Sequence, residues 1–390
     1  MNILFLDQFS DLGGAQRCLL DLLPAMREQG LQAHVAAPGD GELRGRAVAL
    51  GAEFHAMRCG PYESGQKSIG DVARFAAELP RLALEIARLA RRTRADIIYV
   101  NGPRLLPAAS FSSRPMVFHC HSYLGKGYAA ALAGISLGSA QVIGSCNFVL
   151  EPLRPFVGPG QMEVVYNGVA AAGETACPTL LGQLNGLDGT SEPDNLDQRV
   201  GQAVSPARLP QTIGMIGRIA PEKGQLEFVQ AARLLPHNWR FILCGAPLFS
   251  NPRYLELVRE TAAGLPIEFL GWREDVNAVL SELDLLVVPS APIEGTTRVI
   301  LEAYAAEVPV VASASGGIPE IVRDGETGFL AAPGNPPRLA ARIREALADP
   351  VALHTIARNG RRAWRERFTL VEYQRRILDI LERVGSSARK

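Results

Sequence analysis

The sequence predicts an α/β protein with two parallel β-sheets, each covered by helices. Three observations predict it: short apolar strand segments alternate with helical segments, the alternation runs twice along the chain, and a polar stretch separates the two runs. The length of 390 residues fits two domains. Hydrophobic residues make up 47% of the chain and charged residues 21%, which is typical of a globular protein rather than a disordered one.

The first run of segments predicts a seven-stranded, Rossmann-like domain. An apolar strand at 3–6 is followed by Gly13 and Gly14, and then by one helical pattern from Leu19 through Met26 that ends at Gly30. The remaining strands are predicted at 33–37, 53–57, 97–100, 116–119, 141–145 and 163–166. The uncharged stretch 127–150 carries several Ser, Gln and Asn side chains, so we expect helix, turn and strand there rather than a membrane span.

The second run predicts another Rossmann-like domain, with strands at 212–216, 241–244, 268–270, 285–288 and 310–312. Between the runs, 170–210 has no aromatic residue and is rich in Gly, Pro, Ser, Asn and Asp, which is typical of a linker. We therefore predict an N-terminal domain over 1–169 and a second domain over 211–369. A last amphipathic helix over 370–390 can pack on either domain, including back on the N-terminal one.

Charge and cysteine usage exclude some classes of function. Lys plus Arg equals Asp plus Glu at 40 each, so no overall positive charge favours nucleic acid as a partner. The six cysteines are scattered, with no pair at the spacing of a zinc knuckle or a redox motif, and we expect reduced thiols. The apolar run at the N-terminus is short and lacks a basic region before it, so we expect a cytoplasmic protein.

Candidate functional residues follow the strands of the second domain, since ligands of such sheets bind beyond the carboxyl ends of the strands. Arg218 and Lys223 share the loop after 212–216, where a guanidinium and an ammonium group can neutralise a diphosphate. Glu294 and Glu302 flank the start of a helix after 285–288, and their carboxylates can accept hydrogen bonds from two polyol groups, such as a ribose and a hexose. The alternatives are surface cations, and carboxylates favoured by a helix N-terminus.

Weaker candidates lie in three other loops. Gly316 and Gly317 precede a short helix whose free amides can bind a phosphate or a carboxylate, although a tight turn also explains them. In the first domain we expect one of His119 and His121 to point into the cleft, although a structural histidine is the more common case. Paired carboxylates at 40 and 42 and at 324 and 326 lie in turns without a histidine nearby, so we expect no metal site.

Together these residues resemble the pattern of glycosyltransferase family 4, whose members are retaining, sugar-nucleotide-dependent enzymes of the GT-B fold. That fold has two facing Rossmann-like domains with parallel sheets and an interdomain cleft. The resemblance runs in order through the segments 13–17, 121, 166–169, 217–224, 269–272, 294–302 and 316–320. Its strongest element is Glu294 and Glu302, separated by seven residues, beside the loop of Arg218 and Lys223.

The resemblance implies a role for each candidate. Arg218 and Lys223 would hold the donor diphosphate, helped by the amides at Gly316 and Gly317. Glu302 would bind the ribose. Glu294 would bind the transferred sugar beside Thr296 and Thr297, and His121 would contact that sugar at the reacting centre. Gly13 and Gly14 would border the phosphate and the acceptor. Trp272 and Arg273 would contact the base. Thr296 and Thr297 depart from the family's usual residues, so the sugar is left open.

The resemblance also implies a mechanism and a setting. A UDP- or GDP-linked donor would lose its diphosphate with net retention and without a metal or other cofactor, because cations and dipoles stabilise the leaving group. Arginine outnumbers lysine 36 to 4, which indicates a GC-rich bacterial genome. In bacteria, the resemblance implies synthesis of surface polysaccharide or glycolipid. The basic amphipathic segment 78–94 either packs on the core or contacts a membrane carrying a lipid-linked acceptor. A sugar-nucleotide hydrolase or epimerase, or a non-catalytic nucleotide-sugar-binding protein, is the alternative.

Overall fold

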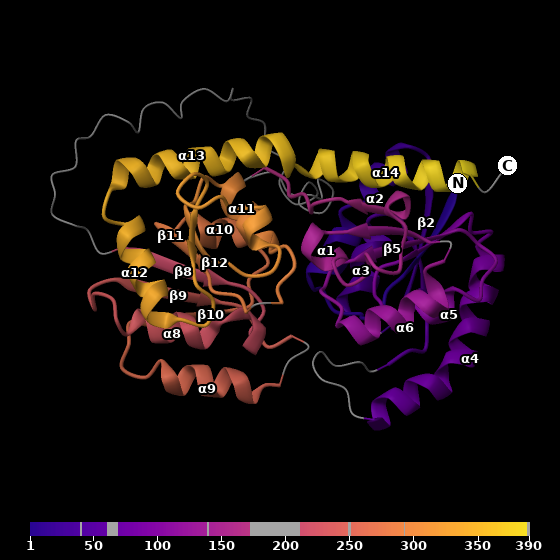
Figure 1. Ribbon diagram of the computed structural model, residues 1–390, viewed down its shortest axis with the longest axis horizontal. Helices are drawn as coiled ribbons and strands as arrows, with labels where there is room; N and C mark the ends of the chain where they lie inside the picture. Colours follow the sequence, from indigo (N-terminus) through magenta and orange to yellow (C-terminus); the bar gives the residue numbers. More distant parts are fainter. Residues whose placement is uncertain are drawn as a thin grey trace, which may run out of the picture.

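The computed structural model describes residues 1–39, 41–60, 69–138, 140–171, 211–248, 251–291 and 293–387. Two α/β domains lie side by side, each built around one parallel sheet (Figure 1). This architecture confirms the predicted fold class. Most of the predicted linker, from 172 to 210, lies outside the described residues, as does Cys177.

The first sheet contains seven strands in the order β3-β2-β1-β4-β5-β6-β7. The strands are β1 (Asn2–Leu6), β2 (Gln32–Ala37), β3 (Glu53–Ala56), β4 (Ile97–Val100), β5 (Met116–Cys120), β6 (Gln141–Gly144) and β7 (Met162–Val164). The helices between them are α1 (Gly14–Leu20), α2 (Leu23–Glu28), α3 (Glu42–Ala49), α4 (Ile69–Arg92), α5 (Leu106–Ala109), α6 (Lys126–Ser136) and α7 (Asn147–Leu150), with a 3₁₀ turn η1 (Pro159–Gln161). The strand order reverses between β1 and β4, the position where such sheets bind ligands.

The second sheet contains six strands in the order β10-β9-β8-β11-β12-β13, and reverses between β8 and β11. The strands are β8 (Thr212–Ile216), β9 (Arg240–Cys244), β10 (Ile267–Gly271), β11 (Leu285–Val288), β12 (Val310–Ser313) and β13 (Phe329–Ala331). The helical elements are η3 (Pro221–Lys223), α8 (Gln225–Ala232), α9 (Arg253–Thr261), α10 (Val276–Leu280), α11 (Arg298–Ala305), η4 (Ile318–Glu320), α12 (Pro336–Ala346), α13 (Pro350–Arg367) and α14 (Leu370–Ser387).

Two expectations about these elements were wrong. The single helix predicted from Leu19 to Gly30 is two helices, α1 and α2, because Pro24 lies at the start of α2, where a missing N–H is tolerated, and could not continue α1. The edge strand β13 was not predicted. It has three residues, too few to show a strand period, and its pairing with β12 makes it a strand.

Alternating side chains of the first sheet pack into two separate cores. Leu4 and Leu6 face one core together with α4, whereas Ile3 and Phe5 face the other together with α1, α2 and α14. Because helices cover both faces, the strands have no polar side and appear in the sequence as continuous apolar runs.

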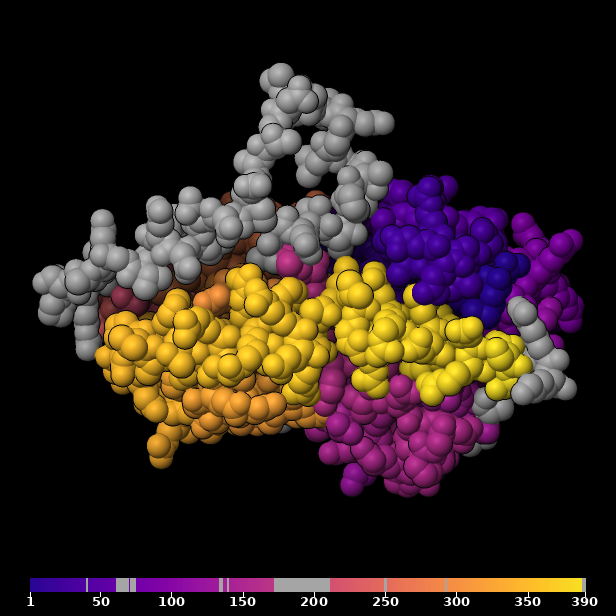
Figure 2. Space-filling model, turned by 90° about the horizontal axis from the view of Figure 1, so that it is seen from above, coloured from indigo at the N-terminus to yellow at the C-terminus, as the bar shows by residue number. Residues whose placement is uncertain are grey.

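The two chain connections between the domains run side by side. Val169 pairs with the segment that joins α13 to α14: its N–H donates to Phe368 O over 3.0 Å, and its carbonyl accepts from Leu370 N over 3.0 Å. A Cβ at Gly168 would lie 2.4 Å from Thr369 O, so only glycine fits this crossing. From there α14 packs on the N-terminal domain, and Figure 2 shows α13 and α14 as one yellow band across both domains.

The apolar side of α4 is buried in the first core through Leu82, Ile86, Leu89 and Ala90. This burial favours the core-packed interpretation of that segment, and membrane contact stays a prediction. Among the described residues, none of the helices combines the length and the apolar character needed to cross a bilayer. The described cysteines, Cys18, Cys59, Cys120, Cys146 and Cys244, are free thiols.

Candidate active site

Cations and carboxylates gather where the order of the second sheet reverses, after β8 and β11. Lys223 Nζ lies 2.7 Å from Glu294 Oε2, and both side chains are mostly buried, with exposed fractions of 22% and 12%. Arg218 forms an ion pair with Glu222 on the next turn and donates from Nη1 to Leu248 O over 3.3 Å. The structure therefore brings two of the predicted donor-binding side chains, Lys223 and Glu294, into contact, with Arg218 in the same loop as Lys223, and each cation is paired with a carboxylate of the chain.

Glycines allow the loops of this cluster to pack closely. Gly224 has φ of 82°, and a Cβ there would lie 2.0 Å from Pro289 O. Gly316 has φ of 53°, and a Cβ there would lie 1.8 Å from Glu294 O. The expectation of a free amide at Gly317 was wrong, since its N–H donates to Glu294 O over 3.0 Å. The turn at Gly316 directs this amide to the neighbouring loop after β11, so the amide supports the backbone of Glu294 instead of facing a ligand.

Helix α11 begins at the predicted place, with Thr297 as its N-cap residue. Thr296 Oγ1 accepts a hydrogen bond of 3.1 Å from Asn167 Nδ2 of the first domain. Thr297 Oγ1 is buried and has no hydrogen-bond partner among the described residues. Glu302 lies one turn into the helix, where its Oε1 is 3.8 Å from Arg298 Nε and its side chain is 20% exposed.

On the first domain, a hydrogen-bonded chain leads to His121. His121 Nε2 lies 2.9 Å from Asn101 Oδ1, and Asn101 Nδ2 donates to Asp7 Oδ2 over 2.6 Å and to Ala15 O over 3.1 Å. Because both amide hydrogens have acceptors, the amide oxygen must face the ring, so His121 carries its proton on Nε2 when neutral. Its Nδ1 is then left as an acceptor.

Burial sets the protonation states of the side chains in this hydrogen-bonded series. Desolvation, with a smaller contribution from Arg298, lowers the pKa of His121 to about 3, so the ring is neutral at pH 7. Desolvation also raises the pKa of Asp7 to about 6, against the hydrogen bond from Asn101. Gln16 Nε2 donates to Asp7 Oδ1 over 2.8 Å, and the carboxyl group is fully buried.

The two predicted histidines have different surroundings. His119 is buried, with Tyr99 Oη 2.6 Å from its Nδ1, and its Nε2 has no hydrogen-bond partner among the described residues. His121 stands at the end of β5, its ring centroid 3.8 Å from that of His119. Its carbonyl oxygen would lie 2.8 Å from a Cβ at Gly295, so this strand end touches the loop of Glu294.

Further contacts between the domains surround this point. Arg298 Nη1 donates to Asp21 Oδ2 over 2.7 Å. Glu320 accepts hydrogen bonds from Asn147 N at 2.8 Å, Phe148 N at 2.8 Å and Tyr166 Oη at 2.9 Å, and so caps the N-terminus of α7 from the other domain. Burial raises the pKa of Glu320, but these hydrogen bonds together lower it below its usual value.

The remaining predicted residues lie around the cluster. Gly13 caps α1 and donates from its N–H to Gln16 Oε1 over 3.1 Å, while a Cβ at Gly14 would meet no atom within 4 Å. Space therefore remains beside the start of α1. Trp272 and Arg273 are exposed after the edge strand β10, and the guanidinium carbon of Arg17 lies 5.7 Å from the Trp272 ring centre.

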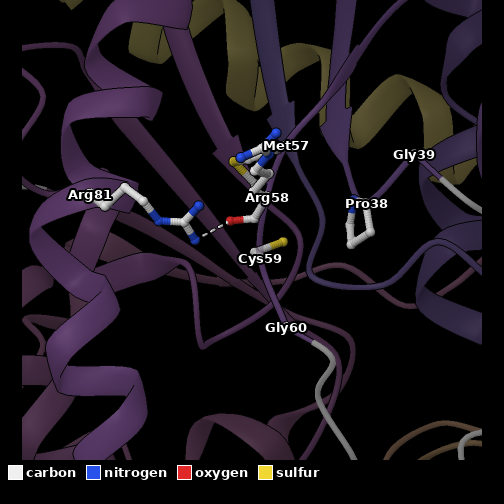
Figure 3. A pocket seen from close by; sticks show the side chains of 7 residues that line it. All are labelled: Pro38, Gly39, Met57, Arg58, Cys59, Gly60 and Arg81. Carbon is white, nitrogen blue, oxygen red and sulfur yellow. Dashed lines mark hydrogen bonds between the residues drawn. The ribbon is translucent and has the colours of Figure 1, made fainter.

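A hollow of about 540 Å³ lies beyond the carboxyl ends of β2 and β3 on the first domain (Figure 3). It is lined by Pro38, Gly39, Met57, Arg58, Cys59, Gly60 and Arg81. Arg81 reaches from α4 and donates to the carbonyl of Arg58 over 2.7 Å. Two guanidinium groups at this rim favour an anionic group.

Several of these residues were missed in the sequence. Asp7 and Asn101 follow β1 and β4 directly, at the point where the strand order reverses, so their position after a strand was a usable signal. Asp21, Asn167 and Glu320 act across the domain interface, and no local pattern in the sequence indicates such partners.

Comparisons with known proteins agree with this arrangement. Residues 210–349 match a family model described as Glycosyl transferases group 1, and residues 12–172 match one described as Glycosyltransferase Family 4. The chain is 33% identical over 183 residues to α-maltose-1-phosphate synthase of Mycobacterium tuberculosis, covering 43% of this chain and 47% of that protein. It is 36% identical over 151 residues to D-inositol 3-phosphate glycosyltransferase of Corynebacterium efficiens, covering 36% of this chain and 35% of that protein.

The chain thus spans less than half the length of these two curated relatives. Similarity to a solved structure extends further. The crystal structure of Anabaena HepE in complex with UDP and glucose superimposes with a TM-score of 0.76 at 25% identity, covering 97% of this chain and 99% of that one.

Proposed function

Because the chain belongs to the family 4 glycosyltransferases with the two-domain GT-B fold, we propose that it transfers a sugar from a nucleoside-diphosphate sugar to an acceptor in bacterial glycan synthesis. The observation that carries the proposal is the contact of both domains at one loop. Lys223 Nζ lies 2.7 Å from Glu294 Oε2, and the adjoining Gly295 lies against the carbonyl of His121. Groups suited to a diphosphate, a sugar and a reacting centre therefore adjoin one another.

The donor is proposed to be UDP- or GDP-linked, and the UDP and glucose bound by Anabaena HepE support the UDP form. Arg218 and Lys223 bind the diphosphate by exchanging their carboxylate partners for its oxygens. The exchange leaves neither cation without a counter-charge, because the diphosphate replaces the carboxylate that each one releases. Glu302 accepts from the ribose hydroxyls, and Glu294, once released by Lys223, accepts from the transferred sugar.

The proposed reaction retains the anomeric configuration. The bond between the anomeric carbon and the diphosphate oxygen breaks, and an acceptor oxygen bonds to the same face of that carbon. The acceptor proton passes to the departing diphosphate, since no side chain is assigned as a base. Arg218 and Lys223 stabilise the charge of the leaving group without a metal. His121, neutral and unprotonated at Nδ1, accepts a hydrogen bond from a sugar hydroxyl and donates no proton at pH 7.

The acceptor is proposed to approach from the first domain. The hollow beside β2 and β3 presents Arg58 and Arg81, so an acceptor with a phosphate or carboxylate group is favoured. A lipid-linked acceptor would bring the enzyme to the membrane surface, and flotation with liposomes of anionic and neutral lipid tests that contact.

The test is a thermal-shift titration with UDP, GDP, ADP, CMP and dTDP in the presence of EDTA, on the wild type and on Glu302→Ala. A nucleotide at 100 times its dissociation constant stabilises the folded protein by about 2.7 kcal/mol. We expect one diphosphate to shift the transition without metal, and Glu302→Ala to lose that shift. No shift with any nucleotide contradicts the proposal.

Product analysis then separates the alternatives. Transfer to an acceptor with the anomeric configuration of the donor, read by NMR, supports the proposed reaction. Free sugar formed at the same rate with and without acceptor indicates a hydrolase, a changed sugar nucleotide indicates an epimerase, and binding without turnover indicates a binding protein.

A further inference from the structure

Three side chains that commonly ligate metals lie together at the edge of the first sheet. His34 lies on β2, and Glu53 and His55 lie on the neighbouring edge strand β3. His34 is opposite Glu53, and Ala36 is opposite His55. Because side chains alternate along a strand, this register places all three on the same face of the sheet.

This cluster is separate from the candidate active site. Glu53 is the first residue of β3, whereas the residues assigned to substrate binding follow the opposite, carboxyl ends of the strands. None of the three residues has a role in the proposed glycosyl transfer, and none of them lines the hollow beyond β2 and β3, although Met57 in that lining is two residues after His55.

The two nitrogens and the Glu53 carboxylate are close enough for one metal ion: one ligand atom from each residue lies within 4.8 Å of the others. His34 Nδ1 lies 3.2 Å from His55 Nε2 and 3.3 Å from Glu53 Oε2, and His55 Nε2 lies 3.6 Å from Glu53 Oε1. Ligand atoms about 2.0 to 2.1 Å from a tetrahedral Zn²⁺ are about 3.3 Å from each other. One ion can therefore contact all three groups with small side-chain adjustments.

Hydrogen bonding alone satisfies these atoms less well. If the two imidazoles are neutral, one nitrogen donates its proton and the other accepts it with its single lone pair, so these two nitrogens have no second proton for the Glu53 carboxylate, 3.3 and 3.6 Å away. A cation between the three groups accepts a lone pair from each of them. An extra proton shared by the histidines is the competing explanation.

The strands hold the ligands in place before any ion binds. The side chains of His34 and His55 are 13% and 10% exposed, so their rings are held by packing, while Glu53 is 66% exposed and leaves an approach from solvent. Metal sites built on such rigid elements bind an ion without the free-energy cost of ordering a loop. Arg92 acts electrostatically on His55, and its charge opposes a bound cation, whereas the Glu53 charge favours one.

We propose that His34, Glu53 and His55 bind one Zn²⁺, with a fourth position open to water. Two imidazoles and one carboxylate favour Zn²⁺ over Mg²⁺ or Ca²⁺, which prefer oxygen ligands alone. The ion joins the edge strand β3 to β2 and stabilises this side of the sheet. The proposal revises the expectation of no metal site, which considered cysteine spacing and carboxylates close together in sequence but not histidines on neighbouring strands.

The test is a Zn²⁺ titration of the chelator-treated full-length protein in competition with a chromophoric chelator. We compare the wild type with Glu53→Gln and His55→Asn, and use His354→Asn, an exposed histidine on α13, as the matched control. We expect one tight Zn²⁺ per chain in the wild type and the control, and affinity reduced about 100-fold or more in the two cluster variants, since loss of a mere supporting residue already costs 10- to 100-fold.

Two further measurements make the result decisive. Co²⁺ in place of Zn²⁺ should give the intense visible bands of a four-coordinate ion in the wild type, and Glu53→Gln should lose them. Circular dichroism shows that the variants remain folded, and Glu53→Gln is the safer one because that side chain is exposed. Equal Zn²⁺ affinity in the wild type and both cluster variants, or no uptake by the wild type, overturns the proposal and leaves a hydrogen-bonded histidine pair.

Discussion

The two sheets present polar residues at the same kind of edge but hold them in different ways. On the first sheet, Asp7, Asn101 and His121 form a chain of hydrogen bonds, with Asp7 and Asn101 buried. On the second sheet, Arg218 and Lys223 are held by ion pairs and keep 22% of their side chains exposed. The first edge is thus organised by desolvation and hydrogen-bond geometry, and the second by charge near solvent.

This difference suggests a division of tasks. A buried hydrogen-bonded chain keeps one protonation state and one position, which suits a group at a reacting centre. Ion pairs that keep some contact with solvent can replace one anionic partner with another and are weakened by salt, which suits the binding of a charged diphosphate. Variants of the two edges should therefore differ in how they affect rate, pH dependence and salt dependence.

The largest effect is expected at the second edge. Arg218→Ala or Lys223→Ala should lower turnover by about 10² or more, because each removes a cation that is proposed to stabilise the leaving group. The measurement is steady-state product formation at saturating donor, with Arg358→Ala, an exposed arginine on α13, as the control. Rates close to wild type in both variants would show that these cations do not support catalysis.

At the first edge, burial of Asp7 predicts a pH-dependent stability. Its pKa is raised from 3.8 to about 6, so the folded state binds the proton more tightly than the unfolded state. The tighter proton binding stabilises the folded state. This contribution is complete below about pH 4 and is lost as the pH rises through about 6, which lowers the free energy of unfolding by about 3 kcal/mol.

Asp7→Asn isolates this contribution, because the amide does not titrate. The free energy of unfolding of the wild type minus that of the variant, from urea unfolding followed by circular dichroism, should fall between pH 4 and pH 7. A difference that stays constant over this range would mean that the Asp7 pKa is not raised by burial.

A smaller effect is expected from the residue that orients His121. Asn101→Ala removes the acceptor for Nε2–H and should lower kcat about tenfold, the value of roughly one hydrogen bond to a neutral group. The dissociation constant of the donor nucleotide should stay unchanged, and the loss of kcat should not depend on ionic strength. An equal loss in nucleotide binding would indicate general disruption of the site, and circular dichroism checks the fold.

The smallest effect concerns the ion pair that competes with the donor. Glu222→Gln removes the carboxylate partner of Arg218 and should tighten binding of the nucleoside diphosphate by up to about fivefold, because an ion pair with this much solvent contact contributes about 1 kcal/mol. Isothermal titration calorimetry at low and high salt measures the affinity for the nucleoside diphosphate, and the increase in affinity should be smaller at high salt. Weaker binding in the variant would instead show that Glu222 positions Arg218 for the ligand.

Much of the second edge could be predicted from the sequence, because its residues directly follow apolar strands. Arg218 and Lys223 lie in the loop after β8, and Glu294 lies in the loop after β11, where its carboxylate pairs with Lys223. Glu302 lies further along, in α11, where its nearest charged partner is Arg298. The functional residues at the edge of the first sheet were harder to predict from the sequence. Asn101 shows its importance only through hydrogen bonds to Asp7 and His121, residues that are 94 and 20 positions away.

The sequence by itself determined the apolar strands, their alternation with helices and the chemical types of the strand-end residues, because burial on both sheet faces imposes continuous apolar runs. Tertiary structure alone decided which charges pair, that Glu320 caps α7 across the interface, that burial lowers the pKa of His121, and that His34 meets Glu53 and His55 across two strands. The physical reason is that desolvation, strand register and domain contact arise between segments far apart in the chain, where no local pattern records them.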